Sequence, residues 1–120
     1  MVNNAHVLVG PDGIVADRVR YGNTFYSRFK GLRGRERLQA GDALVLEPCR
    51  QVHTFGLRFP IDVVFRDRSQ RVVHIQTLEP RRISKFVRNA RSCVELPDGR
   101  ASECGVAEGV QLLVQEKKQA

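Results

Sequence analysis

The residues with the greatest chemical potential lie in one stretch, Pro48 to Phe65, which reads PCRQVHTFGLRFPIDVVF. It holds a cysteine, a histidine four positions later, an arginine, and an aspartate within an apolar run. A cysteine and a histidine can form a nucleophile–base pair, and a histidine with a carboxylate can perform acid–base chemistry or bind a metal. This stretch is therefore where a site is expected.

Spacing argues against thiol chemistry between Cys49 and His53. Val52, Thr54 and Phe55 favour an extended chain, in which residues four apart share a face but lie about 13 Å from one another. A nucleophile–base pair needs hydrogen-bond contact, so we interpret Cys49 as a small buried apolar residue. The three cysteines form no C-x-x-C pair, and we expect no metal and no cofactor.

Asp62 is a carboxylate inside an apolar strand. Ile61, Val63 and Phe65 share one face of that strand, while Asp62 and Val64 share the other. A strand that is apolar on both faces is buried on both, and a buried carboxylate without a partner costs several kcal/mol. We interpret Asp62 as a structural anchor. Its open candidate partners are Arg28, His53, Arg58 and the backbone N–H groups of a neighbouring loop.

The candidate site is a polar cleft on the loop before this strand, formed by His53, Thr54 and Arg58, with Asp62 holding them in place. We expect a non-enzymatic module that binds a small ligand or a protein partner, and we assign no catalytic residue. The first alternative is a hydrolase in which Asp62 orients His53 as a base, or an enzyme with a metal bound there. Either alternative requires the two side chains to lie within hydrogen-bond distance in an open cleft.

The chain is strongly basic, with a net charge of +7 and a pI near 10.0. Two clusters supply much of this charge: Arg28, Lys30, Arg33, Arg35 and Arg37, and then Arg81, Arg82, Lys85, Arg88 and Arg91. Basic patches attract nucleic-acid backbones and anionic lipid, which gives a second alternative function. No aromatic-rich RNA-binding motif accompanies the clusters, so we favour a solvated basic face.

Length and composition predict a single domain over residues 1–120. No apolar run approaches the roughly 20 residues that span a bilayer, and the start lacks a basic and apolar leader. We therefore expect a cytoplasmic protein. Cys93 and Cys104 flank a turn at 97–99, but an odd cysteine count fits a reducing compartment, so we expect no disulfide between them.

Alternation and turn residues predict mostly strands. A hairpin is expected over residues 5–22 with its turn at Pro11–Gly13, followed by a short helix over residues 23–34. Further strands are expected at 42–48, 61–66, 71–78, 92–96 and 110–116, with a helical turn at 101–106 and an extended segment from 51 to Gly56. The fold class is therefore mainly β, a sandwich or barrel with one or two short helices.

The segments RFKGLRGRERL, HTFGLRFPIDVVFRD, VVHI and CVELPDG resemble the domain of unknown function 192 family. The resemblance runs from about Thr24 to Val114, and Arg33 and Leu57 stand where that family usually has methionine. It implies a compact fold resembling a jelly roll and a bacterial or archaeal source, and it implies no agreed activity. The positions that follow the family pattern are Arg28, Gly31, Leu32, Pro60, Asp62, Phe65, Glu95, Leu96 and Gly99.

Two of these positions suggest a structural contact. Arg28 lies on the predicted short helix and Asp62 on the predicted strand. We expect the guanidinium to bind the carboxylate through two parallel hydrogen bonds, which would fasten the helix to the sheet.

Overall fold

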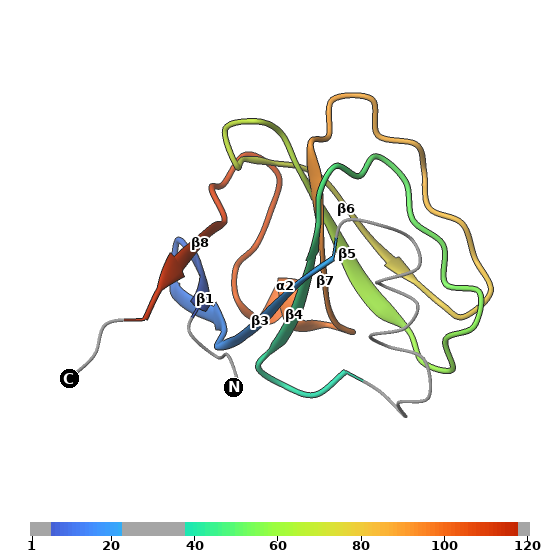
Figure 1. Ribbon diagram of the computed structural model, residues 1–120, viewed down its shortest axis with the longest axis horizontal. Coiled ribbons are helices and arrows are strands. Elements are labelled where there is room, and N and C mark those ends of the chain that lie inside the picture. The colour runs from blue at the N-terminus through green and yellow to red at the C-terminus, as the bar shows by residue number, and fades with distance from the viewer. Residues whose placement is uncertain (1–5, 23–37, 118–120) are drawn as a thin grey trace.

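The computed structural model describes residues 6–22 and 38–117, which form two β-sheets and one short helix (Figure 1). The predicted mainly β class is confirmed, and the two sheets form an open sandwich, not a closed barrel. The elements are β1 (His6–Gly10), β2 (Gly13–Ala16), β3 (Arg18–Gly22), β4 (Asp42–Leu46), β5 (Ile61–Arg66), β6 (Val72–Leu78), β7 (Ser92–Pro97), α2 (Arg100–Glu103) and β8 (Leu113–Glu116).

The smaller sheet joins the two ends of the described chain. Its strand order is β2-β1-β8, and both pairings are antiparallel. The β1–β2 hairpin turns where the sequence predicts it, and Gly13 supplies the positive φ of 117° that a residue without Cβ adopts freely. β1 also pairs with β8, so that His6 lies opposite Glu116.

The larger sheet has the order β3-β4-β7-β5-β6, in which β3 and β4 run parallel and the other neighbours run antiparallel. β5 lies between β7 and β6, and all six of its residues are buried. Its bounds agree with the predicted strand. Because β5 is covered on both sides, its apolar residues contribute to two separate cores, one on each face of the sheet.

One core lies between the larger sheet and two covering loops, residues 47–60 and 79–91. Ile61, Val63 and Phe65 pack there against side chains from the loops, namely Val52, Leu57, Phe59, Val87 and Ala90. The other core lies between the larger sheet, the smaller sheet and α2, and includes Val64, Leu96, Leu8, Val15, Ala101 and Leu112. Figure 1 shows the smaller sheet and the covering loops on opposite sides of the larger sheet.

The two covering loops are joined into a ribbon by backbone hydrogen bonds. The N–H of Thr54 donates to the carbonyl of Arg82 (2.9 Å), that of Ser84 to Val52 (2.8 Å) and that of Val87 to Arg50 (2.8 Å). We call residues 50–55 and 82–87 the loop ribbon. Its inner side chains are buried, and its outer face carries two residues that lie opposite one another, His53 and Ile83.

The two helix predictions have different outcomes. The helical turn predicted near the C-terminus is α2, which follows a left-handed Gly99 with a φ of 87°. The predicted helix over residues 23–34 lies outside the described residues. Within the described ranges, no helix is both long enough and apolar enough to cross a membrane.

Candidate functional site

Asp62 is an internal anchor. Its side chain is buried, with the residue 3% exposed. Oδ1 accepts a hydrogen bond from the Thr77 hydroxyl (2.8 Å), and Oδ2 accepts one from the backbone N–H of Ala101 in α2 (3.0 Å). A backbone N–H was among the candidate partners that the sequence suggested for Asp62. The carboxylate thus fastens β5 to both β6 and α2 through two hydrogen bonds to a charged acceptor.

Thr54 is also used inside the fold. It is wholly buried, and its hydroxyl donates to the carbonyl of Glu79 (2.6 Å) while it accepts from the N–H of Arg82 (2.9 Å). Its carbonyl accepts from the N–H groups of Leu57 (3.1 Å) and Arg81 (3.3 Å). These bonds hold one covering loop against the other, so Thr54 positions the loop ribbon.

His53 lies half-buried on the outer face of the loop ribbon. Its Nδ1 accepts a hydrogen bond from the N–H of Phe55 (3.1 Å), and the centres of the two rings lie 5.1 Å apart. With Nδ1 as acceptor, the neutral imidazole carries its proton on Nε2. The imidazole and the phenyl ring lie against one another, and Ile83 lies opposite His53 on the other half of the loop ribbon.

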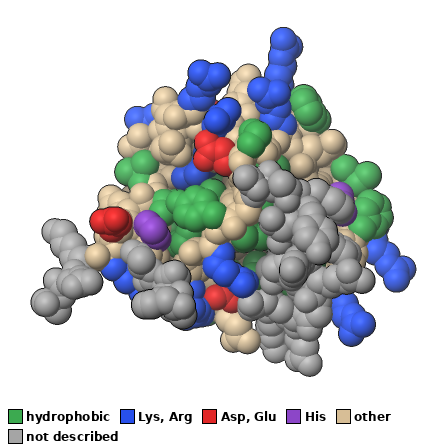
Figure 2. Space-filling model, viewed as in Figure 1, with side chains coloured by type: hydrophobic (Ala, Val, Ile, Leu, Met, Phe, Trp, Pro, Cys, Tyr) green, Lys and Arg blue, Asp and Glu red, His purple; other side chains and the backbone are tan. Residues whose placement is uncertain are grey.

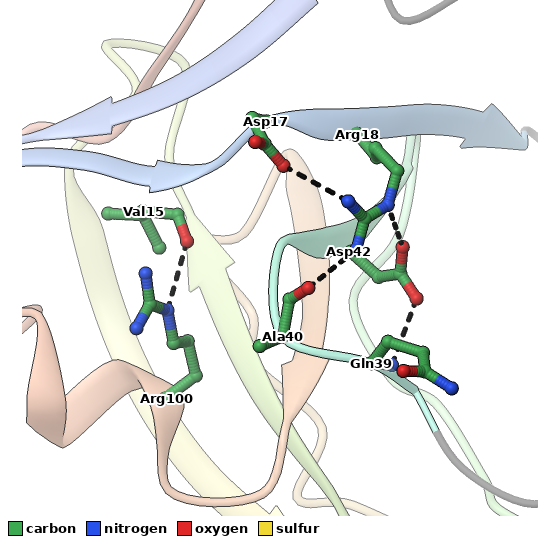
Figure 3. Close-up of polar contacts among 7 residues, drawn as sticks. All are labelled: Val15, Asp17, Arg18, Gln39, Ala40, Asp42 and Arg100. Carbon is green, nitrogen blue, oxygen red and sulfur yellow. Dashed lines mark hydrogen bonds and ion pairs between the residues drawn. The ribbon is translucent and has the colours of Figure 1, made fainter.

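Arg58 is exposed and lines a cleft of about 710 Å³. The lining also includes Gln39 and Ala40, whose turn is held by the ion pair between Arg18 Nε and Asp42 Oδ1 (2.9 Å; Figure 3). The N–H of Gln39 donates to Asp42 Oδ2 (2.9 Å) and Arg18 also donates to the carbonyl of Ala40 (Figure 3). The described lining is Leu38, Gln39, Ala40, Arg58, Phe59, Pro60, Pro97 and Asp98.

The structure places the four predicted site residues in different surroundings. Asp62 shares a face of β5 with Val64, toward α2, whereas His53 and Thr54 belong to the loop ribbon over the opposite face of the larger sheet. Both carboxylate oxygens of Asp62 are bonded to Thr77 and Ala101, so Asp62 does not orient His53. The pairing that a hydrolase would need is therefore not formed.

Two other predictions concern the same residues. The Arg28–Asp62 ion pair involves a residue outside the described ranges and stays a prediction. Within residues 6–22 and 38–117, no three His, Cys, Asp or Glu side chains lie close enough together to hold a metal ion. The thiol of Cys49 lies 3.5 Å from the carbonyl oxygen of Gln51.

Sequence analysis missed the exposed apolar residues of the loop ribbon. Phe55 is 46% exposed, Ile83 59% and Phe86 56%. Phe55 contacts His53, and His53 pairs with Ile83. Ile83 lies within the basic run from Arg81 to Lys85, and an isoleucine in such a run was the signal that could have marked it.

The covering loops that carry these residues are rich in cations. The two covering loops contain two carboxylate side chains, Glu79 and Glu47, and Glu47 is paired with Arg91. Figure 2 shows Lys and Arg side chains along the upper and lower-right edges of this view of the molecule, and a histidine beside hydrophobic side chains at its right-hand edge. The exposed cations of the two loops are Arg50, Arg58, Arg81, Arg82, Lys85, Arg88 and Arg91.

Comparison with known proteins gives a family. The model of DUF192, described as "Uncharacterized ACR", matches residues 7–114. The chain belongs to the DUF192 family. The resemblance expected from the sequence is thereby confirmed, and the match begins earlier than the expected Thr24. A comparison with curated proteins returned no match.

Two crystal structures share this DUF192 fold. One is a protein of unknown function from Novosphingobium aromaticivorans, with a TM-score of 0.74 and 18% identity over 90% of this chain and 82% of that one. The other, from Sinorhizobium meliloti, is described as a "putative transcription regulator", with a TM-score of 0.72 and 18% identity over 91% of each chain. At this identity the likeness establishes the fold alone.

Proposed function

We propose that the chain is a non-catalytic binding module that engages an acidic protein segment through the outer face of the loop ribbon. The observation that carries this proposal is the exposed apolar surface of Phe55 and Ile83, which are joined through His53 in loops rich in exposed cations. His53 and Arg58, two of the residues singled out in the sequence, belong to this face or flank it. Thr54 supports it from beneath.

The exposed apolar residues supply the anchor of the proposed interface. Binding energy at protein interfaces is concentrated in a few aromatic and arginine side chains surrounded by a polar rim. The His53 and Phe55 rings lie against one another, and Ile83 is paired with His53 across the loop ribbon. An apolar side chain of a partner would bury these three together and remove their surface from water.

The surrounding charge specifies the partner. Arg81, Arg82 and Lys85 flank Ile83 in the sequence, and Arg58 follows Phe55 by three positions; all four are exposed. A segment with aspartate or glutamate on either side of an apolar residue complements this arrangement, because opposite charges speed association and exclude partners of the wrong sign. Exposed aromatic rings among cations can also stack on nucleic-acid bases, so a single-stranded oligonucleotide is a competing outcome of the test below.

Asp62 does not contact the partner in the proposed complex. Its two oxygens are bonded to Thr77 and Ala101 on the other face of the sheet. The Thr54 hydroxyl is likewise hydrogen-bonded within the fold, to the carbonyl of Glu79 and the N–H of Arg82. In this account both residues keep the larger sheet and the loop ribbon in place, and the binding contacts come from the ribbon's outer face.

A displayed library of random peptides, selected against the full chain, tests this function. We expect the selected sequences to be enriched in aspartate and glutamate flanking an apolar residue. Binding should weaken as salt rises, because exposed charges are screened. Parallel titrations with a single-stranded oligonucleotide and with vesicles containing phosphatidylglycerol provide the competing outcomes. Selection of peptides without acidic residues, or tighter binding of the oligonucleotide or the vesicles, would overturn the proposal.

A further inference from the structure

We propose that a second site, separate from the outer face of the loop ribbon, binds a phosphate group. It is a cleft of about 370 Å³ where the turn after β5 meets the end of the second covering loop. Four arginines line it together with one carboxylate, and we call it the arginine cleft. Its lining is Arg50, Asp67, Arg68, Ser69, Arg88, Asn89, Ala90 and Arg91.

The charges of the arginine cleft are not balanced within the described protein. Arg91 pairs with Glu47 on its outer side (Nε to Oε2, 3.0 Å), and Arg50 Nε donates to the carbonyl of Ala90 (3.3 Å). Arg68 and Arg88 are exposed, and neither contacts a carboxylate in residues 6–22 or 38–117. Like charges gathered in a concave surface raise the local concentration of anions.

Asp67 does not neutralise these arginines through contact. Its Oδ1 accepts hydrogen bonds from the backbone N–H groups of Ser69 (2.8 Å) and Arg71 (3.1 Å). This arrangement is a turn in which the carboxylate shapes its own loop. It fixes the loop that carries Arg68, so Asp67 contributes to the form of the cleft while its charge is partly satisfied by backbone donors.

The walls of the cleft are tied together by the backbone. The N–H of Arg91 donates to the carbonyl of Arg66 (2.7 Å), and the N–H of Cys49 donates to the carbonyl of Arg91 (3.1 Å). The N–H of Asp67 donates to the carbonyl of Arg71 (2.9 Å). Three separate segments are therefore held in register before any ligand arrives, which reduces the entropy lost on binding.

The chemistry of the lining selects a phosphate. Each guanidinium presents parallel N–H donors that match two oxygens of a phosphate, and Arg is preferred wherever such paired recognition occurs. Ser69 and Asn89 add neutral hydrogen-bonding groups. The volume lies at the lower end of the roughly 300–1,000 Å³ typical of small-molecule sites. It leaves room for free phosphate or for a phosphate monoester on a small molecule.

Titration of the ¹⁵N-labelled full chain with inorganic phosphate at constant ionic strength tests the site. We expect saturable shifts at the amides of residues 67–69 and 88–91. The variants Arg68→Gln and Arg88→Gln should each weaken binding about tenfold, because each removes charge-assisted hydrogen bonds. Arg58→Gln removes the same charge from the other cleft and should leave the affinity unchanged. Unfolding curves confirm that all three variants are folded.

The source of the phosphate is resolved by two further titrations. If adenosine monophosphate binds more tightly than inorganic phosphate, and adenosine alone does not bind, the ligand is a monoester. If both phosphates bind alike, the ligand is free phosphate. Phosphate binding no tighter than chloride, or an equal loss in Arg58→Gln and Arg88→Gln, would overturn the site. The arginine cleft includes none of His53, Phe55 and Ile83, and Arg68 lies outside both covering loops. Loss of phosphate binding in Arg68→Gln can therefore be distinguished from a failed peptide selection.

Discussion

At the scale of single residues, Asp62 is a buried anchor whose hydrogen-bond partners lie far from it in the sequence. Alternation in the strand predicted that its carboxylate is buried, and the structure agrees. Alternation could not predict the donors, because Thr77 lies 15 positions away and Ala101 lies 39 positions away. Their proximity depends on how β6 and α2 pack. Arg66 is buried too, where it donates to Ser92 and Leu112, and nothing in the local pattern indicated this.

Removing the Asp62 carboxylate should be costly. Asp62→Ala leaves the N–H of Ala101 and the hydroxyl of Thr77 without their acceptor, so we expect a loss of about 2–4 kcal/mol in the free energy of unfolding. Asp62→Asn keeps one acceptor oxygen, and Thr77 can accept from its amide, so its loss should be about 1 kcal/mol. Urea unfolding measures both changes. Equal stability of Asp62→Ala and the parent chain would contradict the anchoring role.

Tyr21 should respond to the charge of Glu47. Burial raises the pKa of the Tyr21 phenol above its ordinary value of 10.0, the positive charge of Arg66 lowers it, and Glu47 raises it. Glu47→Gln should therefore lower the pKa of Tyr21. Tyr21 is 58% exposed, so solvent screens the effect. An NMR titration of the phenol, in a Tyr26→Phe background that leaves one tyrosine signal, measures the pKa; an upward shift would contradict the assignment.

The direction of the Tyr21 pKa shift sets the sign of its effect on the free energy of unfolding. A group whose pKa is raised by folding contributes stability below its unfolded pKa, and the contribution is lost as pH rises through the folded pKa. For Tyr21 the loss therefore begins above about pH 10. Glu47→Gln should reduce this loss of stability at alkaline pH. Removing the exposed ion pair between Glu47 and Arg91 should change the stability little at neutral pH.

At the scale of elements, the strands were more predictable than the loops. The run Ile61–Arg66 and the turn around Pro11 have local signals, namely alternation and turn residues, and both form as expected. The predicted extent of the hairpin, residues 5–22, is wrong: β2 ends at Ala16, and β3 pairs with β4 in the larger sheet. The loop ribbon has no such signal. It depends on hydrogen bonds between residues 50–55 and 82–87, which lie far apart in the sequence and on either side of the paired strands β5 and β6. For that reason the exposed apolar residues on its outer face were not predicted.

Thr54 should control the loop ribbon as a unit. Thr54→Val keeps the shape of the side chain but removes the group that binds Glu79 and Arg82. We expect a loss of about 1–3 kcal/mol in the free energy of unfolding, because two partly buried backbone groups lose their partner. The amide of Arg82 should exchange its hydrogen faster than in the parent chain, as should its neighbours. Unchanged exchange at Arg82 would contradict this role.

At the scale of the whole molecule, the two faces of the larger sheet cover two separate hydrophobic cores. Cys93 packs in the core under the covering loops, and Cys104 packs against the core that contains α2, so the sheet separates the two thiols. We therefore expect the melting temperature to be the same with and without a reductant. Protection of both thiols from alkylation in the unfolded, unreduced chain would reveal a disulfide and contradict this arrangement.

The same division separates the two parts of the predicted site. The sequence grouped His53, Thr54, Arg58 and Asp62 because they are near one another along the chain. The larger sheet places Asp62 on the side of α2 and the other three on the side of the covering loops. A linear stretch cannot show which face of a sheet its loop will cover, so the anchor and the surface it supports were predicted as one cleft.

Two isoleucines allow the proposed peptide-binding surface to be tested directly. Ile83 lies on the loop ribbon and Ile14 lies on β2 in the smaller sheet, and each is 59% exposed. The affinity of one selected acidic peptide should be measured for Ile83→Glu and Ile14→Glu. We predict at least a tenfold loss for Ile83→Glu and no change for Ile14→Glu, since only the first buries a carboxylate in the interface. Equal affinities for the two variants would contradict the loop ribbon as the binding surface.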